Sequence, residues 1–104
     1  MSSEVKPFII HVPCGINDKT ELLVILAREG RFPPYFGYNW DALFECLCDF
    51  TWLPEGSICI EHEDIPFADN PDERETYLSI LNEAVDFSKN DVRILAVKFN
   101  QSKT

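Results

Sequence analysis

Short apolar runs alternate along the chain with longer segments in which apolar residues recur every three or four positions. The run FIIHV at Phe8–Val12 is rich in β-branched residues and is followed by the breakers Pro13 and Gly15, which predicts a short buried strand. Ser57–His62 alternates apolar and polar residues after a turn, and Val92–Phe99 is a further apolar run. The pattern therefore predicts three strands.

The two segments between the first and second strands have the periodicity of helices. The first helix is predicted to begin at Asn17 or Asp18 and to end at Gly30, with an apolar face made of Leu22, Leu23, Ile25 and Leu26. The second is predicted to be capped by Asn39 and to run to about Phe50.

A third helix follows an acidic link at residues 63–72 and is predicted to start at Asn70 or Pro71. Its inner side carries Tyr77, Leu78, Ile80, Leu81, Ala84 and Val85. Strands separated by helical segments of this length pair in parallel through right-handed crossovers, so the helices cover the sheet. We expect an α/β fold with a three-stranded parallel sheet and about three to four helices packed around it, in a single domain of residues 1–104.

Aromatic residues gather in the loop before the second helix. The loop FPPYFGYN contains two prolines, which forbid a helix, and Gly37, which permits a positive φ. Tyr35, Phe36 and Tyr38 lie just upstream of Phe44, which falls between the apolar and polar sides of the second helix. The apolar side is predicted to face the core and consists of Trp40, Leu43, Cys46, Leu47 and Phe50.

Negative charge is concentrated in the middle of the chain. The 104 residues carry a formal net charge of -9 at pH 7. Residues 41–75 hold eleven acids and one base, a charge of -10, whereas the rest of the chain holds seven acids and eight bases. This distribution works against binding nucleic acid or an anionic membrane, and it predicts a basic partner.

Three acids of the second helix, Asp41, Glu45 and Asp49, recur at four-residue spacing and are predicted to form one stripe. Like charges at this spacing destabilise a helix, and no neighbouring base relieves them. Aromatic groups beside such a charged patch are typical of a protein interface. The sequence therefore predicts a protein-binding surface on this helix.

No apolar stretch is long enough to span a bilayer, and the N-terminus MSSEVKP lacks the pattern of a secretion signal, so we expect a cytoplasmic protein. In that compartment the four cysteines, Cys14, Cys46, Cys48 and Cys59, are expected to be reduced and to serve as buried small apolar residues. Their spacing does not match a zinc site.

An enzyme is the main alternative from another class of protein. Asp41, Glu45 and Glu61 could form a carboxylate pair for glycoside hydrolysis or hold a magnesium ion. The chain has no glycine-rich phosphate loop and no motif for a Ser or Cys nucleophile, which favours a non-catalytic protein with no cofactor and no metal site. We expect His11 to be paired with a neighbour and His62 to be a solvated strand end.

The segment FPPYFGYNWDALFECL resembles the barstar family of small intracellular inhibitors of barnase-type microbial ribonucleases. The matching positions are Tyr35-Phe36-Gly37, Asn39, Asp41-Ala42-Leu43 and the acid-Cys-Leu sequence at 45–47, and a weaker likeness extends from the second strand to the end. The resemblance implies a three-stranded parallel sheet. The chain departs from the family at two positions, with Glu45 where Asp is usual and Phe44 where the best-known member has Trp.

The resemblance also implies a partner and a set of contact residues. It places Tyr35, Gly37, Asn39 and Asp41 on the toxin-facing loop and helix start, Phe44 and Glu45 at the centre, and Glu83 at the periphery. The full predicted partner-binding set is Tyr35, Gly37, Tyr38, Asn39, Asp41, Phe44, Glu45, Cys48, Asp49 and Glu83. The expected function is inhibition of a basic nuclease toxin, a microbial ribonuclease, by a chain that is monomeric when free. A deoxyribonuclease or a tRNA-targeting toxin is the alternative partner on the same scaffold.

Overall fold

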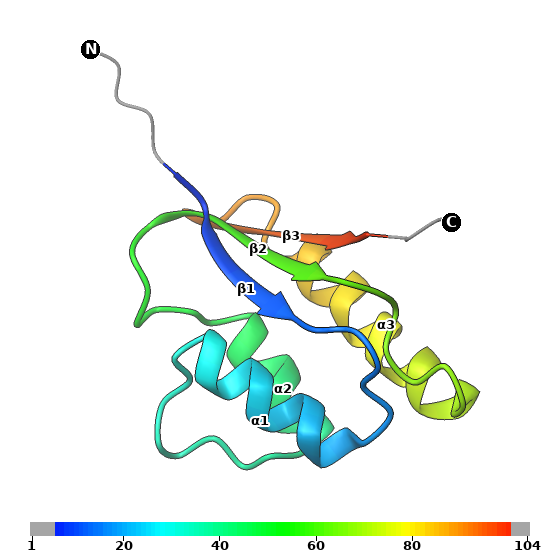
Figure 1. The fold of residues 1–104 in the computed structure, drawn as a ribbon. Helices are drawn as coiled ribbons and strands as arrows, with labels where there is room; N and C mark the ends of the chain where they lie inside the picture. The colour runs from blue at the N-terminus through cyan, green and yellow to red at the C-terminus, as the bar shows by residue number, and fades with distance from the viewer. Residues whose placement is uncertain (1–5, 101–104) are drawn as a thin grey trace.

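The structure is a computed structural model that describes residues 6–100 (Figure 1). Along the chain the elements are β1 (Phe8–Val12), α1 (Lys19–Glu29), α2 (Trp40–Leu47), β2 (Gly56–His62), α3 (Pro71–Phe87) and β3 (Arg93–Phe99). The predicted strands and helices are all present, and their bounds agree with the sequence pattern within a few residues.

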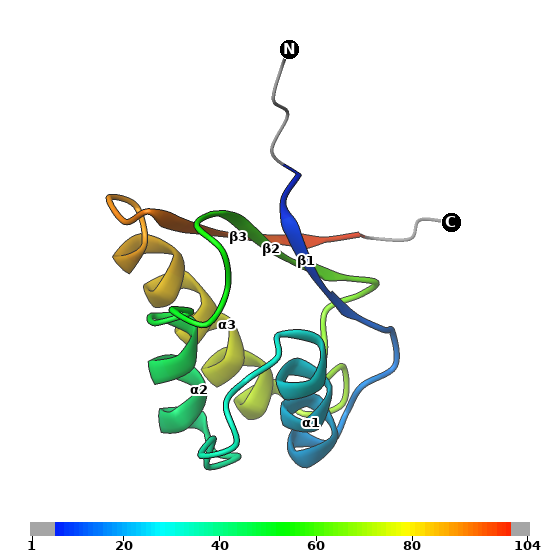
Figure 2. The same cartoon turned by 90° about the vertical axis from the view of Figure 1, so that its left-hand side faces the viewer.

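The three strands form one parallel sheet in the order β1-β2-β3, as predicted. Ile10 pairs with Ile60, which in turn pairs with Val97. Both connections step in the same direction across the sheet, and right-handed crossovers made in one direction place their helices on one face. Figures 1 and 2 show α1, α2 and α3 on the same side of the sheet, with the other face uncovered.

The uncovered face of the sheet explains why some residues of the apolar runs are not buried. Ile9 and Ile94 are 40% and 45% exposed on that face. Beside them lies a polar row in which His11, Glu61 and Lys98 are register partners on the three strands. A continuous apolar run therefore does not mean that both faces of this sheet are covered.

The core lies between the covered face of the sheet and the inner sides of the helices. The predicted N-terminal caps of α1 and α3 are confirmed. Asp18 Oδ2 accepts the Glu21 N–H at 2.9 Å, and Asn70 Oδ1 accepts the Glu73 N–H at 3.3 Å. The largest buried side chains are Ile10, Leu22, Leu23, Leu26, Leu43, Leu47, Ile58, Ile60, His62, Phe67, Tyr77 and Leu81. The predicted apolar sides of all three helices thus face the core.

The prediction that His62 is a solvated strand end is wrong, because the side chain is fully buried. His62 has the same strand parity as Ile58 and Ile60, so its ring points at the helices. Its Nε2 lies 2.7 Å from Tyr77 Oη, and its Nδ1 lies 3.1 Å from the Lys98 carbonyl oxygen. Burial lowers the pKa of His62 to about 4, so the ring is neutral at pH 7.

The four cysteines are free thiols, as expected, but only Cys46 is buried and Cys14 is exposed.

His11 is exposed and its Nε2 lies 3.0 Å from Glu63 Oε2, which confirms the predicted neighbour. No helix in residues 6–100 is both long and apolar enough to cross a membrane.

Candidate functional site

The second helix is shorter than predicted, since it ends at Leu47 instead of near Phe50. Cys48 is the C-terminal cap, and both the Asp49 and the Phe50 N–H groups donate to the Cys46 carbonyl oxygen, at 3.1 and 3.2 Å. Phe50 then adopts the left-handed region with φ of 49°. Asp49 therefore sits in the turn after α2, and the three acids do not form one continuous helical stripe.

Asp41, Glu45 and Asp49 are nevertheless all exposed on the same segment of chain. Within residues 6–100, none of the three takes part in a salt bridge. Asp41 lies in the first turn of α2, where the positive end of the helix dipole favours a carboxylate. The negative charge of Glu45 and Asp49 has no such compensation.

Asn39 holds the start of the helix, as predicted. Its Oδ1 accepts the Ala42 N–H at 2.8 Å, and its backbone carbonyl accepts the Leu43 N–H at 2.9 Å. Its Nδ2 donates to the Gly37 carbonyl oxygen at 3.3 Å. The amide of Asn39 is thus engaged in joining the loop to the helix.

The predicted role of Gly37 in a positive-φ turn is wrong. The loop residue with a left-handed backbone is Tyr38, with φ of 53°, and Gly37 is not in that region. A Cβ at Gly37 would lie 3.2 Å from Asn39 Nδ2, which is closer than an ordinary contact. Glycine is therefore suited to this position because it leaves room for the capping side chain.

A pocket of about 140 Å³ lies between the loop and α2. Four of its lining residues belong to the predicted partner-binding set, and three do not. It is lined by Tyr35, Phe36, Gly37, Ala42, Glu45, Cys46 and Asp49. The pKa of the Cys46 thiol is raised to about 11, mainly by burial and then by the nearby carboxylates of Asp49 and Glu45. Two unpaired carboxylates beside aromatic rings suit a positively charged group.

The sequence contained a signal for the missed lining residues. Ala42 and Cys46 are four residues apart, one turn of helix, and they lie next to the Glu45 and Asp49 pair with the same spacing. The sequence pattern grouped Phe36 with Tyr35 and Tyr38 as aromatics of one exposed surface, which is wrong for Phe36, because its ring is buried while its neighbours in the loop are exposed.

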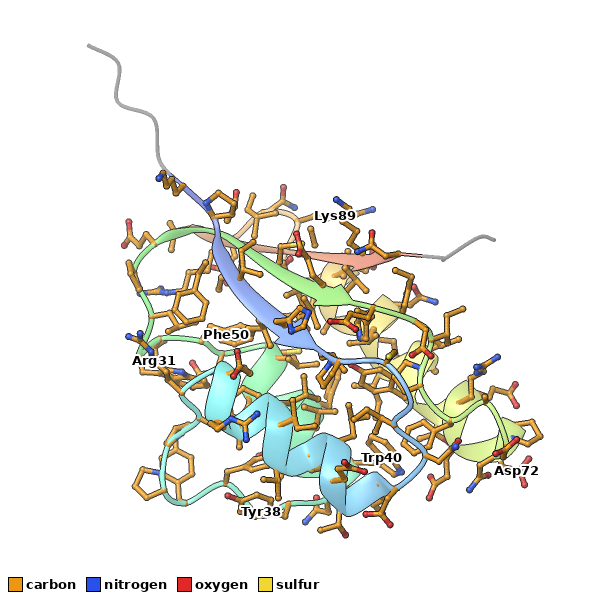
Figure 3. The ribbon with its side chains drawn as sticks, viewed as in Figure 1. Arg31, Tyr38, Trp40, Phe50, Asp72 and Lys89 are labelled. Carbon is orange, nitrogen blue, oxygen red and sulfur yellow. The ribbon has the colours of Figure 1, made fainter. Side chains whose placement is uncertain are left out.

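The aromatic residues of the loop, of α2 and of the turn after it are buried to different extents. Tyr35 is 77% and Tyr38 51% exposed, and Figure 3 shows Tyr38 at the outer edge of the molecule. The Tyr38 ring rests on the buried Phe36, with ring centroids 4.7 Å apart. Phe44 is half-buried, as its place between the two sides of α2 predicts, and Phe50 belongs to the core. Tyr35 thus presents apolar surface beside Glu45 and Asp49, and Tyr38 adds exposed aromatic surface in the same loop.

The last two predicted site residues are Cys48, the C-terminal cap of α2, and Glu83 on α3. Glu83 is exposed on α3, which packs against α2. Burial and then the Glu83 carboxylate raise the pKa of the half-buried Cys48 thiol, which places Glu83 close to the end of α2. The fold therefore brings Glu83 to the candidate surface from 35 residues further along the chain than Cys48. Within residues 6–100, no group of three or more His, Cys, Asp or Glu side chains is arranged to hold a metal ion.

The fold is thus a parallel three-stranded sheet with all the described helices on one face (Figure 1), and α2 and the loop before it carry exposed acids and tyrosines. The family model described as Barstar (barnase inhibitor) matches residues 9–100, nearly the whole chain. The chain belongs to the Barstar family, which confirms the resemblance seen in the loop and second helix. A search of curated proteins finds no match.

Proposed function

We propose that this protein inhibits a basic ribonuclease of the barnase type by covering the active site of the enzyme with α2 and the preceding loop. The observation that carries the proposal is the exposed and unpaired set of carboxylates on Asp41, Glu45 and Asp49. Membership of a family described as barnase inhibitors supports it.

The inhibition needs no chemical step. A ribonuclease binds the phosphates of RNA with Arg, Lys and His side chains, so carboxylates held at the same positions compete with the substrate. The pocket beside Glu45 and Asp49 would receive one cationic side chain of the enzyme, and Tyr35 would cover it. Attraction between the acidic region and the basic enzyme would accelerate the encounter, and salt would weaken that effect.

The role also implies a location and a stoichiometry. An inhibitor that protects a cell from its own ribonuclease acts in the cytoplasm before the enzyme is exported. One α2 surface per chain implies one inhibitor bound to one enzyme molecule.

Calorimetric titration with barnase tests the proposal, with Glu55 as the matched control residue. Glu45→Ala removes a carboxylate from the pocket, whereas Glu55→Ala removes an exposed carboxylate from the loop before β2. We expect Glu45→Ala to weaken binding by about 2 kcal/mol or more, the effect of a central contact. Glu55→Ala should change the binding free energy by less than about 0.5 kcal/mol, since peripheral charges contribute little. Equal affinities for Glu45→Ala and the parent protein would show that the site is elsewhere.

A further inference from the structure

Trp40, the first residue of α2, makes a hydrogen bond that crosses to α3. Its Nε1 donates to Glu73 Oε1 at 3.0 Å. Among the described residues, 6–100, no other side-chain hydrogen bond joins α2 to α3. The position of the N-terminal end of α2 relative to α3 thus depends on one polar contact and on packing.

The indole ring of Trp40 also contacts the other elements near this end of α2. Lys19 Nζ, at the start of α1, lies 5.3 Å from the ring centroid. The rings of Phe67 and Tyr77 lie 6.1 and 6.0 Å away. Figure 3 shows Trp40 next to the N-terminal end of α1. All three helices therefore meet at this side chain.

Glu73 is available for this bond because the cap of α3 does not use its carboxylate. Glu73 occupies the third position of α3, from which a glutamate can reach back to the N–H of the capping residue. The Asn70 N–H instead donates to the Phe67 carbonyl oxygen at 3.1 Å. Glu73 is half-buried, so its carboxylate is a strong acceptor that water only partly competes for.

A helix of eight residues has little stability of its own, so its contacts with the rest of the fold determine where it lies. Trp40 lies between Asn39 and Asp41, which are exposed while Trp40 packs inward. We propose that Trp40 is a positioning residue. Through its bond to Glu73, it fixes the N-terminal end of α2 and therefore the placement of Asn39 and Asp41 against the ribonuclease. The inference rests on the proposed function and identifies how the inhibitory end of α2 is held.

The test uses two measurements on the same variants. Amide hydrogen exchange in the free protein reports on the first turn of α2 through the Ala42 and Leu43 N–H groups, which both bond to Asn39. Titration with barnase reports on binding. The variants are Trp40→Phe, which keeps a ring but removes the indole N–H, Glu73→Ala, and the conservative Glu73→Gln, which retains an acceptor oxygen.

Trp40→Phe and Glu73→Ala should each speed exchange at Ala42 and Leu43 by about tenfold and weaken barnase binding by about tenfold, the effect of losing a hydrogen bond to a charged group. Glu73→Gln should keep both the amide exchange rates and the affinity for barnase within about threefold of the parent protein. The control is Trp52→Phe, which removes an equivalent indole bond, to the Gly30 carbonyl oxygen at 2.9 Å, away from the start of α2. It should not change exchange at these two amides relative to exchange elsewhere in the core.

The outcomes separate this inference from the proposed function. Exchange at Ala42 and Leu43 that stays at the level of the Trp52→Phe control would overturn the positioning role, whether or not barnase binds. If the parent protein binds barnase and Trp40→Phe binds it with the same affinity, the positioning role is overturned as well. A parent protein that does not bind barnase would contradict the proposed function, and the exchange rates would then decide the role of Trp40 by themselves.

Discussion

The buried pair of His62 and Tyr77 makes the stability of this protein sensitive to mild acid. In the folded protein burial lowers the pKa of His62 to about 4, whereas an unperturbed histidine has a pKa of 6.5. At a pH between these two values the unfolded chain takes up a proton that the folded protein does not. The contribution of His62 to stability is therefore complete above pH 6.5 and is lost as the pH falls towards 4.

The size of this loss follows from the difference between the two pKa values. Each unit of difference corresponds to about 1.4 kcal/mol, so His62 should account for a loss of about 3 kcal/mol between pH 7 and pH 4. Burial is the cause of the lowered pKa, and the hydrogen bond to the Lys98 carbonyl oxygen offsets only part of it. A loss of this size is a large fraction of the stability of a small domain.

The comparison protein is the double variant His62→Phe, Tyr77→Phe. It keeps an aromatic ring at 62, where the native ring stacks on Phe99 with centroids 4.3 Å apart, and it removes both partners of the buried hydrogen bond. The carboxylates titrate in both proteins, so the difference between their stabilities isolates the histidine.

Urea unfolding, followed by tryptophan fluorescence at pH 7, 6, 5 and 4, gives that difference. The parent protein should lose about 3 kcal/mol more than the double variant between pH 7 and pH 4. A parallel loss of stability in the two proteins over this range would show that burial does not lower the pKa of His62.

Two further changes test the geometry of the candidate site. Gly37→Ala should lower the free energy of unfolding by no more than about 1 kcal/mol and should weaken barnase binding. The added Cβ would lie only 3.2 Å from Asn39 Nδ2 and would push the capping side chain aside. Urea unfolding measures the first effect and calorimetry the second. Iodoacetamide at pH 8 should alkylate the exposed Cys14 well before Cys46, whose thiol is buried and has a pKa of about 11. Peptide mass spectrometry over time gives the order of alkylation. Alkylation of Cys46 before Cys14 would show that the Cys46 thiol is accessible from the pocket.

The sheet and the outer helices could be predicted because their signals are local. The caps at Asp18 and Asn70 are side chains next to the helices they begin, and the strand at Phe8–Val12 is bounded by breakers. The end of α2 could not be predicted in the same way. It depends on Phe50 adopting a left-handed backbone, a conformation for which a phenylalanine gives no sequence signal.

The features of the candidate site also differ in whether local sequence predicts them. The exposure of Glu45 follows from helical spacing, and Asn39 is a recognisable cap. The burial of His62 depends on which face of the sheet the helices cover, and the bond between Trp40 and Glu73 joins residues that are 33 positions apart. Such contacts arise from the arrangement of whole elements, which periodicity along the chain does not contain.

A titration of barnase activity on RNA shows whether the acidic surface formed by α2 and the turn after it blocks a ribonuclease. Increasing amounts of the protein are added to a fixed amount of barnase at low salt, and the rate of RNA cleavage is measured. The rate should fall linearly to zero at one inhibitor per enzyme, whereas Glu45→Ala, which binds more weakly with the same stoichiometry, should need more protein for the same inhibition. Undiminished cleavage in the presence of a large excess of the protein would contradict the proposed function.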